Sequence, residues 1–434
     1  MTDKSVFSPR ILRPEDANQN WQWDRALASP GFKQVDFETR VDFQRLRKYR
    51  LSRAKNALKN SGLGALILFD VNNIRYITGT KIGEWERDKL CRFALLAGDE
   101  EPFVWDFGSA AVHHQLNCDW LDPNRCLAGM TGMRGTVPPS VGLMKSHAEE
   151  IMSYLKQAGV ADMPIGLDIA ETAMFFELQN AGMTIVDGQQ VMLDAREIKN
   201  IDEITLLNQA ATMVDGVYHM IYEELKPGVR ENDIVALSNQ MLYEMGSDDV
   251  EAINAISGER CSPHPHNFTD RMFRPGDQAF FDILQSYQGY RTCYYRTFNV
   301  GTATSEQNDA YIQCREWLDK AIELIKPGVS TDVVAKAWPK AEEFGFESEM
   351  QAFGLQFGHG LGLALHERPI ISRLVSLENP MEIKTGMVFA LETYCPAKDG
   401  VSAARIEEEV VVTDQGCKVI SLFPADELPI ANRY

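Results

Sequence analysis

The chain lacks the sequence features of membrane, secreted and disulfide-stabilised proteins. No apolar stretch in its 434 residues approaches the roughly eighteen that a membrane-spanning helix needs. The N-terminal residues have no apolar core of the kind found in signal peptides. The eight cysteines are scattered without a CxxC pair, which is typical of reduced thiols in a chain of this length. We therefore expect a cytoplasmic protein without a disulfide framework.

Positive charge is also scarce, with 43 Lys and Arg against 62 Asp and Glu, a formal net charge of −19. Binding to phosphate groups depends on Lys and Arg, so this balance argues against nucleic acid and anionic membranes as partners. The hydrophobic fraction of 44% and the charged fraction of 24% are typical of a soluble globular enzyme. At roughly 150 residues per domain, the length predicts two or three domains.

The first half of the sequence predicts an arm followed by an α/β domain. Residues 1–35 are polar and rich in Pro and Trp, which favours an extended arm. Residues 36–62 have a helical pattern that ends at a glycine, and the apolar run 63–71 predicts a buried strand. Further apolar runs alternate with helical segments such as 147–158. We place an α/β domain at residues 36–195.

A repeated motif marks the second half, over residues 196–434. A long amphipathic helix is predicted from Ile201 and ends at the Lys-Pro-Gly-Val sequence 226–229, and a second helix ends at the same four letters at 326–329. A further helix is expected after each turn, over 231–245 and 331–343. The recurrence predicts a pseudo-symmetric domain of two halves; chance recurrence of a common turn is the alternative.

The aromatic segment 276–301 predicts a β-hairpin with its turn at Gln288-Gly289. Asp282 and Cys293 lie almost symmetrically about that turn, so we expect them to be cross-strand neighbours with Cβ atoms about 5 Å apart. A carboxylate and a thiol at this separation can ligate one metal ion. The alternative is an aspartate at a strand end and a small buried cysteine.

Histidines and isolated carboxylates in the last third of the chain are further candidate metal ligands. The glycine-rich segment 358–369 holds His359 and His366, and glycines leave an imidazole unhindered. Glu392 lies within an apolar strand, which is costly unless the carboxylate is paired or binds a metal.

The strand-like segment around Glu407 carries three consecutive glutamates. Glu407 and Glu409 share one strand face, and Glu408 takes the other, where we expect it to be solvated. Together with Asp282, His359 and Glu392, Glu407 would complete a hard, oxygen-rich site suited to Mn, Fe, Co or Zn.

The order of these segments resembles the pita-bread family of methionine aminopeptidase, aminopeptidase P, prolidase and creatinase. The segment 69–79, FDVNNIRYITG, resembles the N-terminal domain of the two-domain members. The resemblance implies an α/β (α+β) fold, with a creatinase-like α/β domain at 36–195 and a pseudo-symmetric pita-bread domain at 196–434. It also implies a homodimer in which the N-terminal arm lies near the neighbouring subunit.

The resemblance implies four metal ligands in this chain. Asp282 matches the first Asp of the family, which heads a strand, and His359 matches the His of a Gly-His-Gly motif. Glu392 matches a Glu within a strand, and Glu407 matches the bridging Glu that follows Arg-Ile. Thr393 stands where the family usually has Pro. The second Asp, which bridges two ions in the peptidases, falls on Cys293. This loss argues against an ordinary dinuclear peptidase and favours one divalent Fe, Zn or Mn ion. Cys293 either binds that ion as a thiolate or stands beside it.

The resemblance also implies catalytic and substrate-binding residues. His366 matches a histidine that contacts the substrate near the reacting centre. In the loop 257–267, neither His264 nor His266 fits the usual spacing; His266-Asn267 resembles a creatinase pair, so His266 is preferred. The residues assigned to substrate binding are Tyr295, Trp85 and Arg405.

The favoured hypothesis is a metal-dependent hydrolase that cleaves a C–N bond in a dipeptide or in a guanidino or amide metabolite. Glu392 would accept a proton, while the histidines stabilise the developing anion and protonate the leaving nitrogen. The acidic balance and Tyr287, Tyr290, Tyr294 and Tyr295 favour a cationic substrate through cation–π attraction.

Three alternatives remain open at this point. The arm and the run 73–76, Asn-Ile-Arg-Tyr, resemble an iron-dependent dimethylsulfoniopropionate lyase. A metal-free, creatinase-like amidinohydrolase is the second alternative. A non-enzymatic binding module is the third, and the four retained ligands argue against it.

Overall fold

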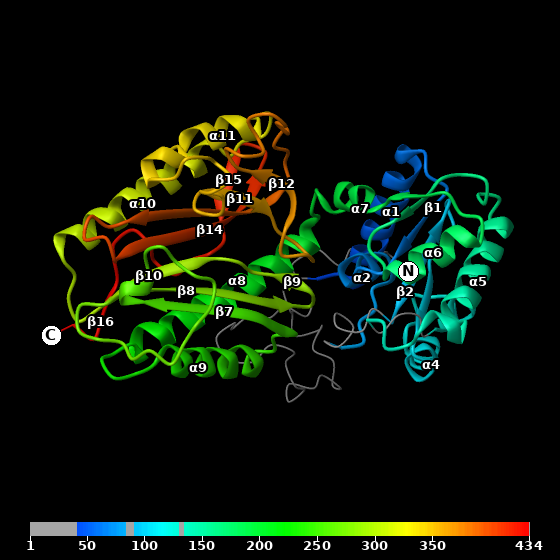
Figure 1. The fold of residues 1–434 in the computed structure, drawn as a ribbon, viewed down its shortest axis with the longest axis horizontal. Coiled ribbons are helices and arrows are strands. Elements are labelled where there is room, and N and C mark those ends of the chain that lie inside the picture. The colour runs from blue at the N-terminus through cyan, green and yellow to red at the C-terminus, as the bar shows by residue number, and fades with distance from the viewer. Residues whose placement is uncertain (1–40, 84–90, 130–133, 434) are drawn as a thin grey trace, which may run out of the picture.

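Two lobes make up the part of the chain that this computed structural model describes, residues 41–83, 91–129 and 134–433 (Figure 1). The predicted arm at 1–35 and the predicted substrate-binding Trp85 lie outside the described residues. Among those residues, no helix is long and apolar enough to cross a bilayer. All eight cysteines are described, and none is in a disulfide. The predicted domain limits remain a proposal.

The N-terminal lobe is a sheet flanked by helices. Its elements are α1 (Phe43–Ser61), β1 (Ala65–Leu68), α2 (Val71–Thr78), β2 (Phe93–Ala97), β3 (Phe103–Asp106), α4 (Gly108–Asn117), the 3-10 helix η3 (Pro123–Arg125), β4 (Cys126–Ala128), the 3-10 helix η4 (Pro139–Val141), α5 (Leu143–Gln157), β5 (Ile165–Leu167), α6 (Thr172–Asn180), β6 (Ile185–Asp187) and α7 (Gln189–Arg196). The strand order is β4-β3-β2-β1-β5-β6, and β1 is parallel to β5 but antiparallel to β2.

The apolar run 63–71 forms a shorter strand than predicted, because a helix begins inside it. All four residues of β1 are buried, as expected for a central strand. The side chain of Asp70 then accepts the backbone N–H groups of Asn72 and Asn73, at 2.8 and 3.2 Å, and so caps α2. Asp168, which follows β5, accepts the backbone N–H of Asp70 at 3.0 Å. The start of α2 is therefore fixed by two carboxylates.

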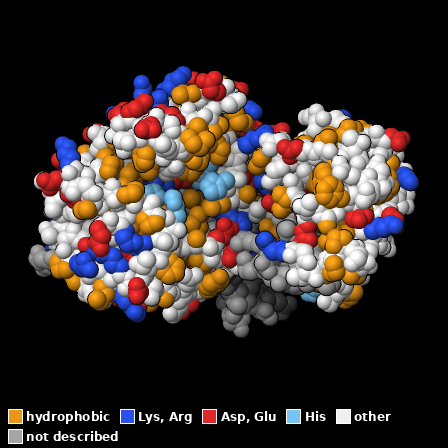
Figure 2. Space-filling view, viewed as in Figure 1, with side chains coloured by type: hydrophobic (Ala, Val, Ile, Leu, Met, Phe, Trp, Pro, Cys, Tyr) orange, Lys and Arg blue, Asp and Glu red, His pale blue; other side chains and the backbone are white. Residues whose placement is uncertain are grey.

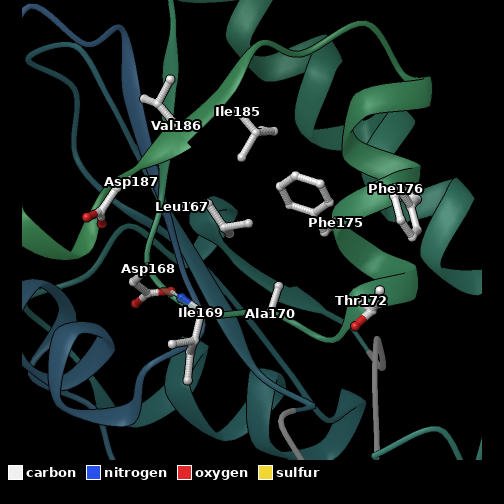
Figure 3. A pocket seen from close by; sticks show the side chains of 10 residues that line it. All are labelled: Leu167, Asp168, Ile169, Ala170, Thr172, Phe175, Phe176, Ile185, Val186 and Asp187. Atoms are coloured by element: carbon white, nitrogen blue, oxygen red, sulfur yellow. Dashed lines mark hydrogen bonds between the residues drawn. The ribbon is translucent and has the colours of Figure 1, made fainter.

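A cavity of about 580 Å³ opens at the carboxyl ends of β5 and β6, beside α6 (Figure 3). Its lining is mainly apolar and includes Leu167, Phe175 and Ile185, with Asp168 and Asp187 at its edge. Neither of the two groups of neighbouring metal-ligand side chains found in the described residues lies here. The cavity therefore does not belong to the predicted metal centre.

The C-terminal lobe consists of two sheets with helices on their outer faces (Figure 1). Its elements are α8 (Ile201–Glu224), α9 (Glu231–Glu244), β7 (Asp249–Ser257), the 3-10 helix η5 (Gly258–Arg260), β8 (Gln278–Tyr287), β9 (Tyr290–Arg291), β10 (Tyr295–Val300), α10 (Ser305–Leu324), α11 (Thr331–Ala337), the 3-10 helix η6 (Ala341–Phe344), β11 (Phe357–Gly360), β12 (Glu367–Ile371), β13 (Val388–Pro396), β14 (Ala403–Thr413), β15 (Gly416–Val419) and β16 (Ile430–Ala431). One sheet has the order β16-β10-β8-β7, with β9 on β8, and the other β12-β11-β13-β14-β15.

The predicted internal repeat is confirmed by matching hydrogen bonds at its two turns. Gly228 and Gly328 both have positive φ, at 92° and 82°, which glycine adopts without steric cost. The Gly228 N–H donates to the Phe273 carbonyl at 3.0 Å, and the Gly328 N–H donates to the Ile383 carbonyl at 2.9 Å. In each half, a helix pair therefore packs against a sheet through the same turn, which gives the pseudo-symmetric architecture.

The helix predicted at 331–343 is too long. Helix α11 ends at Ala337, and η6 follows after Trp338-Pro339. Proline has no backbone N–H and disfavours helical geometry at the residue before it, so the helix stops there.

A single hydrophobic cluster links the two lobes. It contains Leu46 of α1, Leu207 of α8 and Phe281 of β8, each at most 2% exposed. The surface is hollowed between the lobes, and histidine side chains gather in that hollow (Figure 2). The two lobes therefore share one core, and the hollow lies over their junction.

Candidate metal centre

Four predicted ligands lie on strands of the two sheets of the C-terminal lobe. Glu392 in β13 pairs with Glu407 in β14, so their carboxylates leave the same sheet face. His359 lies on β11, next to β13, and Asp282 on β8 of the other sheet. All four are at most 4% exposed. Asp282 lies in the middle of β8, not at the head of a strand as the resemblance implied.

The hairpin turn at Gln288-Gly289 is confirmed, but the predicted cross-strand pair is wrong. The two turn residues have φ of 51° and 87°, and Tyr287 pairs with Tyr290. In this register, Asp282 lies opposite Tyr295.

Cys293 lies near Asp282, although it is not the residue directly opposite Asp282 on the neighbouring strand. The chain leaves the strand between β9 and β10, and the Cys293 N–H donates to Glu409 Oε1 at 2.7 Å. The thiol of Cys293 is therefore a diagonal neighbour of Asp282 rather than its direct partner.

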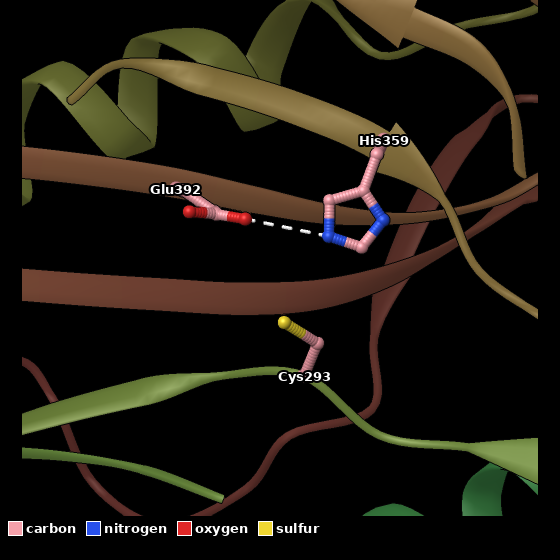
Figure 4. A group of neighbouring side chains, drawn as sticks. All are labelled: Cys293, His359 and Glu392. Atoms are coloured by element: carbon pink, nitrogen blue, oxygen red, sulfur yellow. Dashed lines mark ion pairs between the residues drawn. The ribbon is translucent and has the colours of Figure 1, made fainter. Parts of the chain in front are cut away.

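The structure brings the five predicted ligands into two overlapping groups. The ligand atoms of Cys293, His359 and Glu392 all lie within 4.8 Å of one another (Figure 4), and so do those of Asp282, Cys293 and Glu407. In Figure 4 the sulfur of Cys293 points toward the imidazole and carboxylate above it. Cys293 belongs to both groups and is 5% exposed.

The orientation of these side chains fits a cation. The Nδ1 of His359 lies 2.9 Å from the Gly360 carbonyl, which places a proton on Nδ1, and its Nε2 faces Glu392 Oε1 at 3.3 Å. Asp282 Oδ2 accepts from Asn254 at 3.1 Å, whereas Oδ1 is buried without a hydrogen-bond partner among the described residues. Carboxylate, imidazole and thiol donors together suit Fe, Zn or Mn.

Arg405 supplies a fixed positive charge at the edge of the cluster. Its Nη2 donates to Glu392 Oε2 and lies 3.2 Å from Glu407 Oε1. Its Nη1 lies 3.1 Å from His264 Nε2, and its guanidinium stacks 4.7 Å from the Tyr295 ring. Arg405 is 1% exposed, so its charge acts at low dielectric. Arg405 was assigned to substrate binding from the sequence, and here it contacts Glu392 and Glu407. Tyr295, assigned likewise, lies against the Arg405 guanidinium.

Burial raises the pKa of Asp282 to about 7, and the charge of Glu392 adds to the effect. Burial and Glu392 also raise the pKa of Glu407 well above its usual range. For Glu392, burial opposes the charged form, but the contacts with His359 and Arg405 outweigh it and lower the pKa. Burial, followed by Asp282, raises the pKa of the Cys293 thiol. Such opposite shifts within one cluster are typical of a functional site.

The two loop histidines lie side by side, with ring centroids 4.6 Å apart, but they differ in their contacts. His264 is half-buried, and both its nitrogens are engaged: Nδ1 lies 3.2 Å from the Pro265 carbonyl and Nε2 accepts from Arg405. Burial and Arg405 lower its pKa to about 3. His266 is exposed, and burial lowers its pKa as well. Of the two, His266 is therefore the more accessible side chain.

His366 lies on the other side of the cluster, beside the ligand His359. Their ring centroids are 4.3 Å apart, and Phe357 stacks against His366 at 6.5 Å. The His366 side chain is exposed at its outer edge, and the desolvation of its packed face together with His359 lowers its pKa to about 4. It is therefore a neutral imidazole at the rim of the cluster at neutral pH.

Glu408 is not solvated, contrary to the prediction from its strand face. It is 4% exposed and bridges Arg296 at 2.8 Å and Arg315 at 2.7 Å. The opposite face of β14 is covered by α10, which carries Arg315, so the carboxylate is buried in an ion pair instead of in water.

The hairpin tyrosines do not form a cation-binding surface. Tyr290 donates to Glu203 at 2.9 Å and Tyr294 donates to Asp215 at 2.7 Å, both within the core. The ring of Tyr295 is covered by Arg405. The sequence-based expectation that this cluster of tyrosines receives a cationic group is wrong for Tyr290 and Tyr294.

Sequence reasoning missed two residues that support the cluster. Asn254 of β7 donates to Asp282, and its Nδ2 also lies 3.2 Å from the Tyr295 hydroxyl. Glu409 holds the backbone of Cys293. A polar side chain in the apolar run of β7 and a second acidic residue on the face of Glu407 were the available signals.

Two family models match this chain. The creatinase/prolidase N-terminal domain matches residues 50–198, and metallopeptidase family M24 matches residues 205–414, the part that holds the five clustered ligands. The chain belongs to metallopeptidase family M24. The family predicted from the motifs is thereby confirmed, and this M24 chain is an enzyme of a family that works with divalent metal ions.

Several curated and solved proteins are similar to this M24 chain over most of its length. It is 27% identical over 387 residues to a probable dipeptidase PepE of Mycobacterium tuberculosis, with 86% of this chain and 94% of that protein covered. It is 24% identical over 398 residues to the dimethylsulfoniopropionate lyase DddP of Roseovarius nubinhibens, with 89% and 87% covered.

Solved structures confirm the predicted fold class. The crystal structure of dipeptidase PepE from Mycobacterium ulcerans superposes with a TM-score of 0.72 at 23% identity, with 90% of this chain and 99% of that chain covered. An Xaa-Pro dipeptidase from Bacillus anthracis gives 0.70 at 19% identity, with 88% and 99% covered. At these identities the likeness establishes the two-domain fold alone.

Proposed function

We propose that this M24 enzyme is a metal-dependent hydrolase that cleaves a C–N bond in a small substrate, a dipeptide or a guanidino or amide metabolite. The observation that carries the proposal is the buried cluster of one imidazole, one thiol and three carboxylates, in which an oxygen of Asp282 has no hydrogen-bond partner within the described part of the chain. Asp282, Cys293, His359, Glu392 and Glu407 would hold one divalent Fe, Zn or Mn ion.

The contacts of Arg405 support one ion rather than two. Its Nη2 binds Glu392 Oε2 and faces Glu407 Oε1, so one oxygen of each glutamate is already neutralised by a fixed cation. Cys293 also stands where the family has a bridging carboxylate. A second ion would have to displace Arg405 from the two glutamates. Because Arg405 is 1% exposed, its charge would then be buried without a partner.

When bound, a divalent ion at these ligands supplies Lewis-acid polarisation and lowers the pKa of a coordinated water. The other roles fall to side chains of the chain itself. Glu392 is kept ionised by Arg405 and would accept the proton of the attacking water. His266 and His366 lie on opposite sides of the cluster and are neutral at pH 7. One would donate its N–H to the developing oxyanion, and the other would take up the proton that Glu392 accepts from the water and pass it to the leaving nitrogen. His264, bound on both nitrogens, would hold Arg405 in place.

A substrate panel combined with metal analysis tests this function. Xaa-Pro dipeptides, guanidino compounds and amides should be screened with the protein loaded with Fe, Zn or Mn. We expect release of an amine or ammonia, its loss in chelator, and a loss of at least about 100-fold in His366→Ala, the usual size of a general acid–base contribution. Activity that persists in chelator would contradict the metal mechanism and favour a creatinase-like amidinohydrolase.

A lyase is the second candidate, because the similarity to DddP extends over 89% of this chain. A sulfonium substrate included in the panel separates the two reactions. Release of a volatile sulfide without consumption of water would exclude the hydrolase and establish a C–S lyase.

We also propose that the enzyme is a cytoplasmic homodimer, as the family resemblance implies. Light scattering on the purified chain tests the assembly, and a monomer at micromolar concentration would contradict it.

A further inference from the structure

The start of α2, in the N-terminal lobe, contacts both chain segments that lead into the candidate site. Asn72 and Asn73 are adjacent residues of the motif 69–79, to which the proposed function gives no role. Their side-chain oxygens each accept a hydrogen bond from a different arginine. Those arginines belong to two separate networks that end on one segment, Gly362–Glu367.

The first network runs through the hairpin that carries Cys293. Arg291 Nη1 donates to Asn72 Oδ1 at 2.8 Å, and the Arg291 side chain also pairs with Glu251 of β7. The backbone N–H of Arg291 donates to the Gly362 carbonyl at 2.9 Å. The beginning of the segment Gly362–Glu367 is therefore tied to the hairpin, two residues before Cys293.

The second network runs through the connection between the lobes. Arg196 Nη1 donates to Asn73 Oδ1 at 2.6 Å, and Arg196 Nε lies 3.2 Å from Glu367 Oε1. Lys199 Nζ donates to Glu367 Oε2 at 2.9 Å. Glu367 Oε1 in turn accepts the backbone N–H of Ala364 at 3.1 Å.

All the charged groups of the second network are buried, with Arg196, Lys199 and Glu367 at most 4% exposed. Two cations on one carboxylate lower its pKa despite the burial. A Cβ atom on Gly362 would lie 2.6 Å from Glu367 Oε2, so the segment packs directly against the carboxylate. Removal of one partner would leave uncompensated charge in the core.

We propose that Asn73, Arg196, Lys199 and Glu367 are positioning residues that hold the segment Gly362–Glu367, and with it His366, against the ligand His359. Glu367 follows His366 directly and begins β12, where it pairs with Gly360 of β11. The N-terminal lobe thus sets the place of a histidine in the C-terminal lobe. The functional meaning of this role rests on the proposed function of His366, whereas the structural part does not.

Hydrogen exchange measured by mass spectrometry on the full chain tests the network without a substrate. In Lys199→Met and Glu367→Gln, we expect exchange in peptides covering residues 361–367 to rise about tenfold or more, because a charge-assisted hydrogen bond is lost. Lys199→Arg keeps the charge and should restore protection. Lys384→Met is the matched control, since Lys384 pairs with Glu197 of the same connection at 3.5 Å but is half-exposed and does not contact Glu367.

Two results would overturn the proposal: unchanged exchange at 361–367 in both variants, or an equal rise throughout the C-terminal lobe, which marks a general loss of stability. Failure of the proposed function would show separately, as absence of turnover in the wild type with the exchange pattern intact. On a substrate from the panel, Glu367→Gln should lower kcat at unchanged metal content, and should add no further loss in a His366→Ala background.

Discussion

Asp168 in the N-terminal lobe and Asp282 in the C-terminal lobe are the same residue type in similar electrostatic conditions, yet they do different things. Burial raises the pKa of both, to about 6 for Asp168 and about 7 for Asp282. Asp168 accepts four hydrogen bonds, from the backbone of Phe69, Asp70 and Ile169 and from the Asn73 side chain. Asp282 accepts one, and its Oδ1 has no partner among the described residues.

The difference shows how to tell whether a carboxylate with a raised pKa stabilises the fold or is available to bind a metal. A carboxylate whose lone pairs are filled by backbone N–H groups is a fixed part of the fold, because its partners belong to the chain. A carboxylate oxygen that accepts no hydrogen bond, and that lies beside other potential metal-binding side chains, is still available to bind a metal. The raised pKa alone does not separate the two cases, but the hydrogen bonds that each carboxylate accepts do.

The sharpest way to test this comparison is to neutralise the open carboxylate. In Asp282→Asn, we expect the affinity for Zn²⁺ or Fe²⁺ to fall roughly 100-fold, because a charged ligand is lost. The unfolding free energy in chelator should change little, since the Asn254 contact can be kept. Calorimetric titration with the metal measures the first effect and urea unfolding the second. The exposed Asp309→Asn serves as control, and equal affinity in both variants would remove Asp282 from the ligand set.

The converse change is made at Asp168, the carboxylate that accepts four hydrogen bonds. Asp168→Asn should lower the unfolding free energy by about 2 kcal/mol, because an amide cannot accept from four donors. Metal affinity should stay at the wild-type value. Urea unfolding in chelator gives the stability, and parallel metal titration gives the affinity. If the variant lost its metal while remaining as stable as the wild type, the distinction drawn here would fail.

Substitution of Cys293 is expected to have a smaller effect, because it replaces one candidate metal ligand and leaves the other four in place. Cys293→Asp should shift the preference from Zn²⁺ toward Mn²⁺ by about tenfold, since oxygen replaces a softer thiolate. Cys293→Ser removes the sulfur without adding a carboxylate and should show only part of this shift. Competition titrations with the two metals measure it. Identical preferences in the three proteins would mean that Cys293 stands beside the ion rather than on it.

The smallest expected effect is the pH dependence that Asp168 brings to stability. Its pKa in the folded chain, about 6, lies above the usual value near 4, so its stabilising contribution is complete at acid pH and is lost as the pH rises through 6. Because Asp168 is only half-buried, we expect the wild type to lose about 1 kcal/mol more than Asp168→Asn between about pH 4 and pH 7. Urea unfolding in chelator at both pH values measures the difference. Parallel profiles would rule out the shift.

Local patterns predicted the elements and the side chains that gather in the candidate metal centre. The Lys-Pro-Gly-Val repeat located both helix ends, because a proline–glycine pair stops a helix whatever surrounds it. Glu392 stood out because a lone carboxylate in an apolar strand needs a partner, and His359 because of its flanking glycines.

Contacts between distant segments account for what the sequence did not predict. The burial of Glu408 depends on Arg296 and Arg315, which come from a different strand and from α10. The partner of Asp282 was misplaced because the two-residue turn fixes the register at Tyr287 and Tyr290, which puts Tyr295 rather than Cys293 opposite Asp282. The role of Asn73 could not be predicted, because it depends on a contact with Arg196, which lies more than a hundred residues away in the sequence.

The place of Arg405 has a consequence for how the two glutamates can be buried. Glu392 and Glu407 would repel each other in an empty, dry cavity, but the guanidinium holds them both and cannot lose its proton. The chain thus carries its own counter-ion. The charge of Arg405 allows the two glutamates to be buried side by side without a bound cation.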